Sequence, residues 1–133
     1  MDAEERFEFW LDSAEYDLES AEAMFETGRW VYVVFMCQQA IEKLLKGLYI
    51  LYSEDEPPRT HKLSRLIDFY SEKLPEDIDE DRYALFDRLS AFYISGRYTE
   101  YKDKMSQSAD IEEAKDLLDK TKETFAWLLT LKR

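Results

Sequence analysis

The hydrophobic positions of the chain recur at steps of three and four residues over most of its length. In the first segment they are Phe7, Leu11, Ala14, Leu18, Ala21 and Phe25. This spacing places the side chains on one stripe of an α-helix. Gly28, in "ETGRW", suits the end of such a helix. We therefore predict a first helix that starts near Phe7 and ends before Gly28.

The second apolar segment is ambiguous at its start, because "WVYVVFMC" alone fits either a buried strand or a buried helix. The following "QQAIEKLLKGLY" is rich in helix formers and continues the same stripe. We predict one long helix from Trp30 to about Tyr52. Gly47, in its middle, costs about 1 kcal/mol relative to alanine, which predicts that another helix approaches closely there.

Proline and acidic runs divide the rest of the chain. Pro57 and Pro58 end the second helix, and Thr60 is the predicted N-cap of a short helix over "HKLSRLIDFYSEKL". After the acidic "PEDIDED", two further stripes predict a helix that ends near Gly96 and a last long helix. The two stripes are Leu85, Leu89 and Phe92, and then Ile111, Ala114, Leu118, Thr121, Phe125 and Leu128.

Together these elements predict a single all-α domain over residues 1–133, an up-and-down four-helix bundle with an additional short helix. Composition agrees, since three glycines and three prolines are too few for a turn-rich β fold. The eight Phe, nine Tyr and three Trp are many for one small core. We expect some of these aromatic side chains to lie at a subunit interface.

The net charge of −12 argues against a general nucleic-acid coat protein but leaves room for a local basic site. The single cysteine, Cys37, excludes an internal disulfide and fits a reducing cytoplasm, and its apolar neighbours predict a buried thiol. The longest apolar run, residues 30–37, is too short to span a bilayer. No secretory signal opens the chain. We expect a cytoplasmic protein that does not contact membranes.

The second helix carries a polar face. Gln39, Lys43 and Lys46 are predicted to lie one above another, with Gln38 and Glu42 beside them. Spacing alone favours a solvated face on which a Glu42–Lys46 pair adds only a few tenths of a kcal/mol. The more specific prediction is a structural polar network of Gln39, Glu42 and Lys43.

One basic island stands out in this acidic sequence. Residues 57–67, "PPRTHKLSRLI", contain no acidic residue but hold Arg59, Lys62, Arg65 and the only histidine, His61. Cations next to the N–H groups at a helix start would suit a phosphate. The alternative, which the residues leave equally open, is that these cations balance the neighbouring acidic linkers.

Several kinds of site are excluded. One histidine and one cysteine cannot assemble a structural zinc site within one chain or the Glu-x-x-His repeats of a di-iron bundle. Neither a GxGxxG nor a GKS/GKT phosphate loop is present. A Ser–His–Asp set stays open, although no nucleophile elbow supports it. We predict no metal and no cofactor.

The stretch "YISGRYTEY", residues 93–101, places an arginine among tyrosines where a helix ends. Gly96 lets the helix stop. Arg97 then either binds a ligand or pairs with a buried carboxylate such as Glu42. In the first case Tyr93, Tyr98 and Tyr101 would sandwich the guanidinium plane or stack on a base.

Four motifs, in this order, resemble the HEPN (higher eukaryote and prokaryote nucleotide-binding) domain family across nearly the whole chain. They are Trp10, Ala14, Asp17, Leu18 and Ala21; then Gln39, Ala40, Glu42, Lys43, Leu44 and Lys46; then Thr60, His61 and Leu63; and last Arg97, Tyr98, Thr99 and Glu100. The last motif matches only in part an arginine–tyrosine–proline–aspartate signature of the family.

The resemblance implies a helical bundle, commonly a homodimer, and often the partner of a small nucleotidyltransferase in a two-component or toxin–antitoxin pair. Other members are metal-independent endoribonucleases with an Arg-x(4–6)-His motif. No histidine follows Arg97 here, while Thr99 and Glu100 replace the signature proline and aspartate. Whether the chain is an enzyme therefore stays open.

Our leading hypothesis is a homodimeric HEPN protein that binds nucleotide or RNA and works with a nucleotidyltransferase. Its expected ligand contacts are Arg97, Tyr98, Tyr101, Lys43, Lys46 and His61. One alternative is a metal-independent ribonuclease with Arg97 and His61 as its catalytic candidates. The other is a non-catalytic dimerising scaffold in which the motif residues form an interior network.

Overall fold

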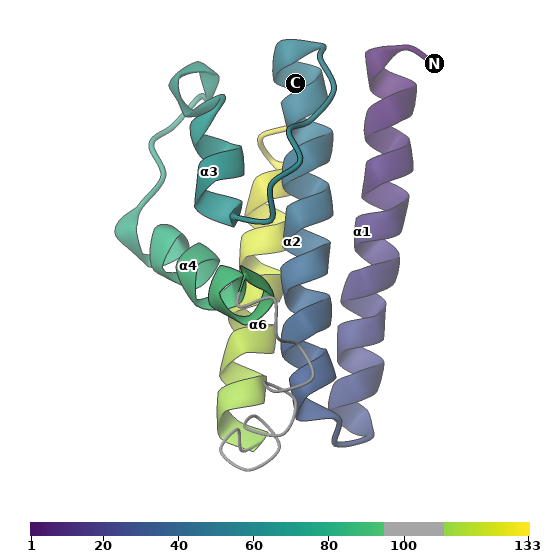
Figure 1. The fold of residues 1–133 in the computed structure, drawn as a ribbon, viewed down its shortest axis with the longest axis vertical. Coiled ribbons are helices and arrows are strands. Elements are labelled where there is room, and N and C mark those ends of the chain that lie inside the picture. Colours follow the sequence, from purple (N-terminus) through teal and green to yellow (C-terminus); the bar gives the residue numbers. More distant parts are fainter. Residues whose placement is uncertain (95–110) are drawn as a thin grey trace.

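The computed structural model describes residues 1–94 and 111–133, and these residues form helices joined by short connections (Figure 1). In chain order the elements are α1 (Ala3–Glu26), α2 (Trp30–Ser53), α3 (Leu63–Asp68), the 3-10 turn η1 (Ser71–Lys73), α4 (Glu80–Ile94) and α6 (Ile111–Leu129). The described residues contain no strand. The predicted all-α bundle with an additional short helix is confirmed.

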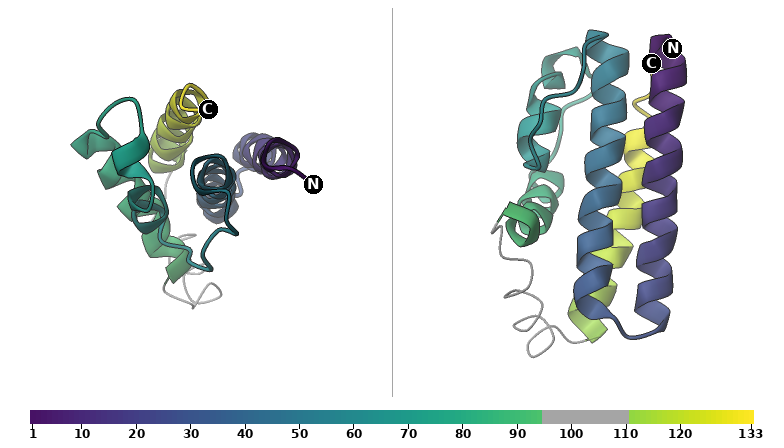
Figure 2. Two further views of the ribbon diagram at one scale, coloured as in Figure 1. Left: turned by 90° about the horizontal axis from the view of Figure 1, so that it is seen from above. Right: turned by 45° about the vertical axis from the view of Figure 1, so that its right-hand side comes forward.

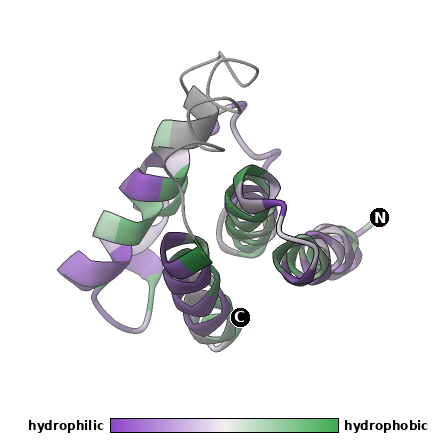
Figure 3. Ribbon diagram, turned by 90° about the horizontal axis from the view of Figure 1, so that it is seen from below, coloured by the Kyte–Doolittle hydropathy of each residue, from purple (hydrophilic) through white to green (hydrophobic). Residues whose placement is uncertain are grey.

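Helix α2 is the centre of the molecule, with α1 on one side and α3, α4 and α6 around the others (Figure 2). A helix that is apolar on most of its surface must be buried on most of its surface. Figure 3 shows this hydropathy, with α2 hydrophobic over much of its length. Val33, Val34 and Cys37, all buried, lie in the ambiguous start of the segment. That start is therefore helical, as predicted.

Helices α1 and α2 form an antiparallel hairpin with a defined start, turn and contact. Asp2 and Glu5 close a capping box at the start of α1. Gly28 adopts φ 74°, in the left-handed region that glycine tolerates best, where the chain turns into α2. A Cβ added at Gly47 would lie 3.1 Å from Cβ of Trp10 and 3.2 Å from Cδ1 of Phe7. The predicted close helix approach at Gly47 is confirmed.

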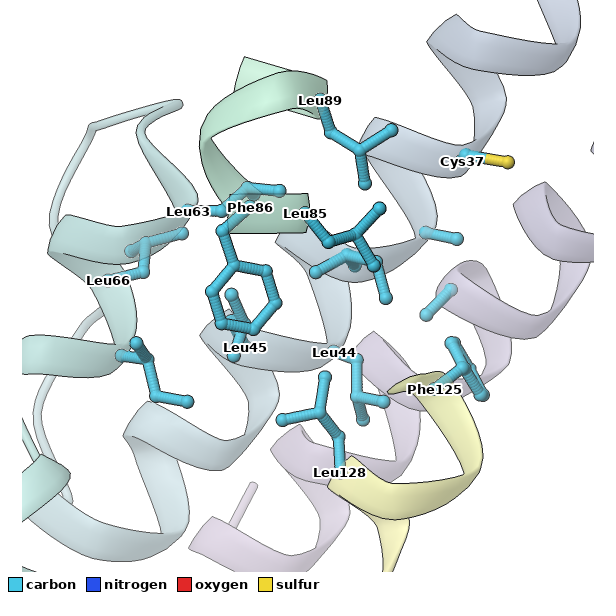
Figure 4. Packing of buried hydrophobic residues seen from close by; sticks show 14 of the residues in the cluster. Cys37, Leu44, Leu45, Leu63, Leu66, Leu85, Phe86, Leu89, Phe125 and Leu128 are labelled. Atoms are coloured by element: carbon cyan, nitrogen blue, oxygen red, sulfur yellow. The ribbon is translucent and has the colours of Figure 1, made fainter. Parts of the chain in front are cut away.

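The apolar core surrounds α2 and includes buried residues of α1, α3, α4 and α6, part of which Figure 4 shows. Leu44 of α2, Leu85 of α4 and Leu128 of α6 point toward one another within it. Cys37 is fully buried, and burial raises the pKa of its thiol to about 12. The thiol is therefore protonated near neutral pH, which fits a packing role.

The short helix departs from the prediction at both ends, because α3 already ends at Asp68 and the separate turn η1 follows it. Helix α3 begins at Leu63 rather than directly after Thr60, and its N-cap residue, Lys62, makes no side-chain cap bond. The hydroxyl of Thr60 accepts from the N–H of Lys62, while the N–H of Leu63 donates to Oγ of Ser90 at 3.0 Å. The predicted N-cap is thus wrong, because α4 supplies the hydroxyl that satisfies the first N–H of α3.

The predicted helix end at Gly96, with Arg97, Tyr98 and Tyr101, lies outside the described residues. Among the helices that the structure does describe, none combines the length and the apolar character needed to cross a bilayer.

Candidate functional site

The centre of the candidate site is Glu42, whose carboxylate is only 6% exposed. Its Oε1 accepts from Nε2 of Gln38 at 2.9 Å and lies 3.0 Å from Nδ1 of His61. Its Oε2 lies 3.0 Å from Nζ of Lys46, whose side chain is 12% exposed. One buried carboxylate therefore meets an amide, an imidazole and an ammonium group. We call these four residues the Glu42 cluster.

The contact with Glu42 bears on the tautomer of His61. A carboxylate only accepts hydrogen bonds. The imidazole nitrogen that faces it, Nδ1, must therefore carry hydrogen. A carboxylate on Nδ1 is a recurrent way in which proteins orient an imidazole.

Gln38 fastens the chain before α3 onto α2. Its Nε2 also donates to the backbone carbonyl of His61 at 3.2 Å, and its Oε1 accepts from Nε2 of Gln39 at 2.7 Å. Gln38 itself is fully buried, and these two bonds to His61 and Gln39 are partly buried. The hydrogen bond from Gln38 to the His61 carbonyl attaches the turn before α3 to α2, and the bond from the Leu63 N–H to Ser90 attaches it to α4.

The fastened turn displays cations on the surface. Arg59, Lys62 and Arg65 are exposed, and none of them forms an ion pair with a carboxylate in the part of the chain that the structure describes. We call residues 59–65 the cationic segment. Guanidinium groups bind phosphate oxygens bidentately, so this segment suits an anionic ligand. Helix α3, with six residues, is too short to contribute much through its dipole.

Lys43 belongs to a different cluster. Its Nζ lies 2.8 Å from Oδ2 of Asp17 and donates to Oγ of Ser13 at 2.8 Å, both on α1. The structure thus brings Gln39, Lys46 and His61 into or beside the Glu42 cluster, but it turns Lys43 toward α1. We call Lys43, Asp17 and Ser13 the Lys43 cluster.

Sequence reasoning missed Ser13 and Ser90 and gave Gln38 no role of its own. The four-residue step from Gln38 to Glu42 would have been a usable signal for their contact. No local signal marks Ser90, which lies 27 residues from the N–H it accepts.

Arg97, Tyr98 and Tyr101 lie outside the described residues, so a contact between Arg97 and Glu42 stays a prediction. Within residues 1–94 and 111–133 no group of three or more His, Cys, Asp or Glu side chains is arranged to hold a metal ion.

A separate hollow of about 310 Å³ lies between α4 and α6 and contains none of the predicted site residues. Its cations are already neutralised. Arg82 pairs with Asp79 at 2.5 Å, while Arg88 and Lys120 share Asp116 at 3.3 Å and 3.1 Å. Because of this balance the hollow has little preference for an anion, in contrast to the cationic segment.

The fold agrees with comparisons to known proteins. The family model of the HEPN domain matches residues 7–131, so the chain belongs to the HEPN domain family. Its fold is similar to that in the crystal structure of TT1696 from Thermus thermophilus, with 26% sequence identity and a TM-score of 0.75. That similarity covers 94% of this chain and 97% of TT1696. No curated protein sequence matches the chain.

Proposed function

We propose that this chain is a homodimeric HEPN protein that binds a nucleotide or an RNA through phosphate groups. It acts with a small nucleotidyltransferase, in a two-component or toxin–antitoxin pair. The observation that carries the binding proposal is the cationic segment. On a chain of net charge −12, Arg59, Lys62 and Arg65 of this segment form no ion pair among the described residues, and His61 joins the segment to the Glu42 cluster.

The fastening of this segment favours binding. Gln38 and Ser90 already order its backbone, so a ligand would not have to supply that ordering free energy. Arg59 and Arg65 would contact phosphate oxygens, with Lys46 and His61 beside them. Arg97, Tyr98 and Tyr101 complete the proposed site, in which the tyrosine rings would stack on a base.

We assign Lys43 to the structural network rather than to ligand contact. Its ammonium group is engaged by Asp17 and Ser13, and a phosphate would have to displace that pairing. This assignment narrows the expected phosphate contacts to the side of α2 that carries Lys46.

The test is a fluorescence-polarisation titration with labelled nucleotides and a short RNA in EDTA. We expect saturable binding by the wild type, weakened by about tenfold in the Arg59→Ala/Arg65→Ala double variant and lost in a folded Arg97→Ala variant. Lys115→Ala removes an exposed lysine of α6, paired at 3.3 Å with Asp119, and serves as the control. Equal weakening in that control, or no binding by the wild type, would overturn the proposal.

The assembly is tested separately. Sedimentation equilibrium should give twice the chain mass, and the protein should co-purify with a nucleotidyltransferase encoded beside it. The aromatic excess motivates this expectation, since several rings remain partly exposed on the isolated chain. A monomer that forms no such complex would leave only the binding part of the proposal.

A second candidate function is metal-independent RNA cleavage by Arg97 and His61. The contact between Glu42 and Nδ1 of His61 favours it, because a buried carboxylate that orients an imidazole prepares that ring for proton transfer. RNA should then be cleaved in EDTA, and His61→Ala should abolish cleavage while binding persists. Intact RNA would exclude this candidate. If substitutions of the motif residues lower protein stability and leave ligand binding unchanged, the non-catalytic scaffold is favoured instead.

A further inference from the structure

The face of α1 that points away from the bundle carries two exposed aromatic side chains. Phe9 is 66% exposed and Tyr16 is 71% exposed, and they lie seven residues apart. Neither ring contacts another aromatic ring or a cation in the described part of the chain. Large apolar side chains grouped on one face, rather than scattered, commonly mark an interaction surface.

Carboxylates alternate with these aromatic residues along the same stripe. They are also spaced by seven residues and all are exposed: Glu5, Asp12, Glu19 and Glu26. Asp12, Glu19 and Glu26 form no ion pair with a cation among the described residues, and Glu5 closes the capping box. The stripe therefore presents uncompensated negative charge on both sides of each ring. We call it the α1 outer stripe.

The position of this stripe follows from the helix repeat. Phe7, Ala14 and Ala21 are fully buried and face α2, while Phe9 and Tyr16 follow Phe7 and Ala14 by two positions. At 3.6 residues per turn, two positions correspond to about 200° around the helix, so the outer stripe lies opposite the core. Figure 2 shows α1 at the edge of the molecule, with α2 as its principal neighbour.

The spacing of the outer stripe indicates the shape of its occupant. Alternating steps of four and three residues give the 3.5-residue repeat that lets two helices pack along a seam. The stripe from Glu5 to Glu26 is about 32 Å long, which matches a partner helix of about six turns. A helix therefore fits this face better than an irregular peptide.

The charges indicate the chemistry of the occupant. A second copy of α1 would place carboxylates against carboxylates along the seam, which is unfavourable. RNA would be repelled for the same reason. A helix with Lys or Arg every seven residues and apolar side chains between them would satisfy both the carboxylates and the rings.

We infer that the α1 outer stripe is a docking surface for a basic amphipathic helix of a partner protein. This inference deepens the partner part of the proposed function by naming the face and the chemistry of the contact. It uses none of the residues of the cationic segment or of the Glu42 cluster, so the two sites are tested independently.

The test uses a labelled synthetic helical peptide of about six turns with Leu and Lys in matching heptad positions, and a second peptide in which Glu replaces each Lys. Fluorescence anisotropy should show saturable binding of the Lys peptide to the wild type and none of the Glu peptide. The Phe9→Ala/Tyr16→Ala double variant should bind the Lys peptide at least about tenfold more weakly. Phe69→Ala, which removes another half-exposed ring, is the matched control and should bind as the wild type does.

Three outcomes would overturn the inference. The first is equal binding of the Lys peptide to wild type and double variant, which would show unspecific charge attraction. The second is no binding at all. The third is a dimeric wild type and a monomeric double variant in sedimentation, which would assign the stripe to a second copy of the chain. Failure of nucleotide binding with intact peptide binding would reject the nucleotide proposal and leave this one standing.

Discussion

Two neighbouring residues of α2, Glu42 and Lys43, serve two different polar clusters. Glu42 faces the turn before α3 and meets Gln38, His61 and Lys46 almost out of contact with water. Lys43 faces α1, where it pairs with Asp17 while remaining 26% exposed. Consecutive residues of a helix point about 100° apart, so adjacent positions reach different neighbours.

Because the two clusters lie on different sides of α2, we expect substitutions in them to affect protein stability and ligand binding differently. The Lys43 cluster joins two long helices that pack closely at Gly47, and its ammonium group is paired with Asp17 and Ser13. The Glu42 cluster holds a turn of irregular backbone whose cations face the solvent. Substitutions in the first cluster should therefore change stability alone, whereas substitutions in the second should change stability and ligand affinity together.

The largest effect is expected for Glu42→Ala. This variant leaves the mostly buried ammonium of Lys46 without its carboxylate and removes one of the two acceptors of the buried Gln38 amide, at a cost of about 3 kcal/mol in the free energy of unfolding. Nucleotide affinity should fall with it, because the cationic segment is released. Urea denaturation measures the first effect and polarisation the second, with Glu42→Gln as the milder control. A loss well below about 1 kcal/mol would contradict our description of this cluster.

Asp17→Ala should cost less, about 1 kcal/mol, because Lys43 keeps its bond to Ser13 and part of its side chain is already in water. Urea denaturation of this variant and of Glu42→Ala under one set of conditions gives the comparison directly. Nucleotide affinity should be unchanged. An equally large loss of stability, or a loss of affinity, would remove the distinction between the clusters.

Gly47→Ala should also lower stability, by about 1 kcal/mol, although alanine is the better helix former. The added Cβ would lie 3.1 Å from Cβ of Trp10, an atom that the backbone of α1 holds in place. Thermal unfolding followed by circular dichroism measures the change, and Glu123→Ala at an exposed position of α6 is the control. A Gly47→Ala variant more stable than the wild type would contradict this prediction, because it would show that α1 and α2 can move slightly apart without a loss of stability.

The smallest effect at neutral pH concerns a third side of α2, where Cys37 is fully buried. Its thiol pKa rises from 9.0 to about 12 on folding, because of burial. Between these values the unfolded chain loses the proton first, so the free energy of unfolding falls as pH rises above 9. The slope from one such group approaches about 1.4 kcal/mol per pH unit.

Cys37→Ala should lack this part of the slope when urea denaturation is followed from about pH 8 to about pH 10. Burial also raises the pKa of Tyr70 well above 10.0, and the resulting loss of stability affects both proteins equally. Identical slopes for the wild type and the variant would mean that the thiol gains access to water in the folded protein.

Most of the fold was predictable because its signals are local. The apolar stripes set α1, α2 and α6, and Gly47 indicated a close contact that the structure confirms. The start of α3 was not predictable in this way. Thr60 looked like its cap, but Ser90 of α4 takes the N–H of Leu63, and no local pattern reports a partner that distant.

In the candidate site, too, the residue types were predictable from the sequence, whereas the contacts between distant residues were not. The sequence named Glu42, Lys43 and His61, since their residue types and their order match a family motif. It did not indicate that Glu42 and Lys43 would face different neighbours. Their contacts join residues 19 and 30 positions apart, from Glu42 to His61 and from Lys43 to Ser13.

Taken alone, the sequence determined the long helices α1, α2 and α6, the burial of α2, the acidic net charge and the location of the basic island. These properties depend on composition and on the repeat of a single helix. Only the tertiary structure decided which carboxylate is buried, which cations it leaves exposed and which face of α1 stays open. These features depend on how each helix is rotated against its neighbours, and that rotation is set by packing between segments far apart in the chain.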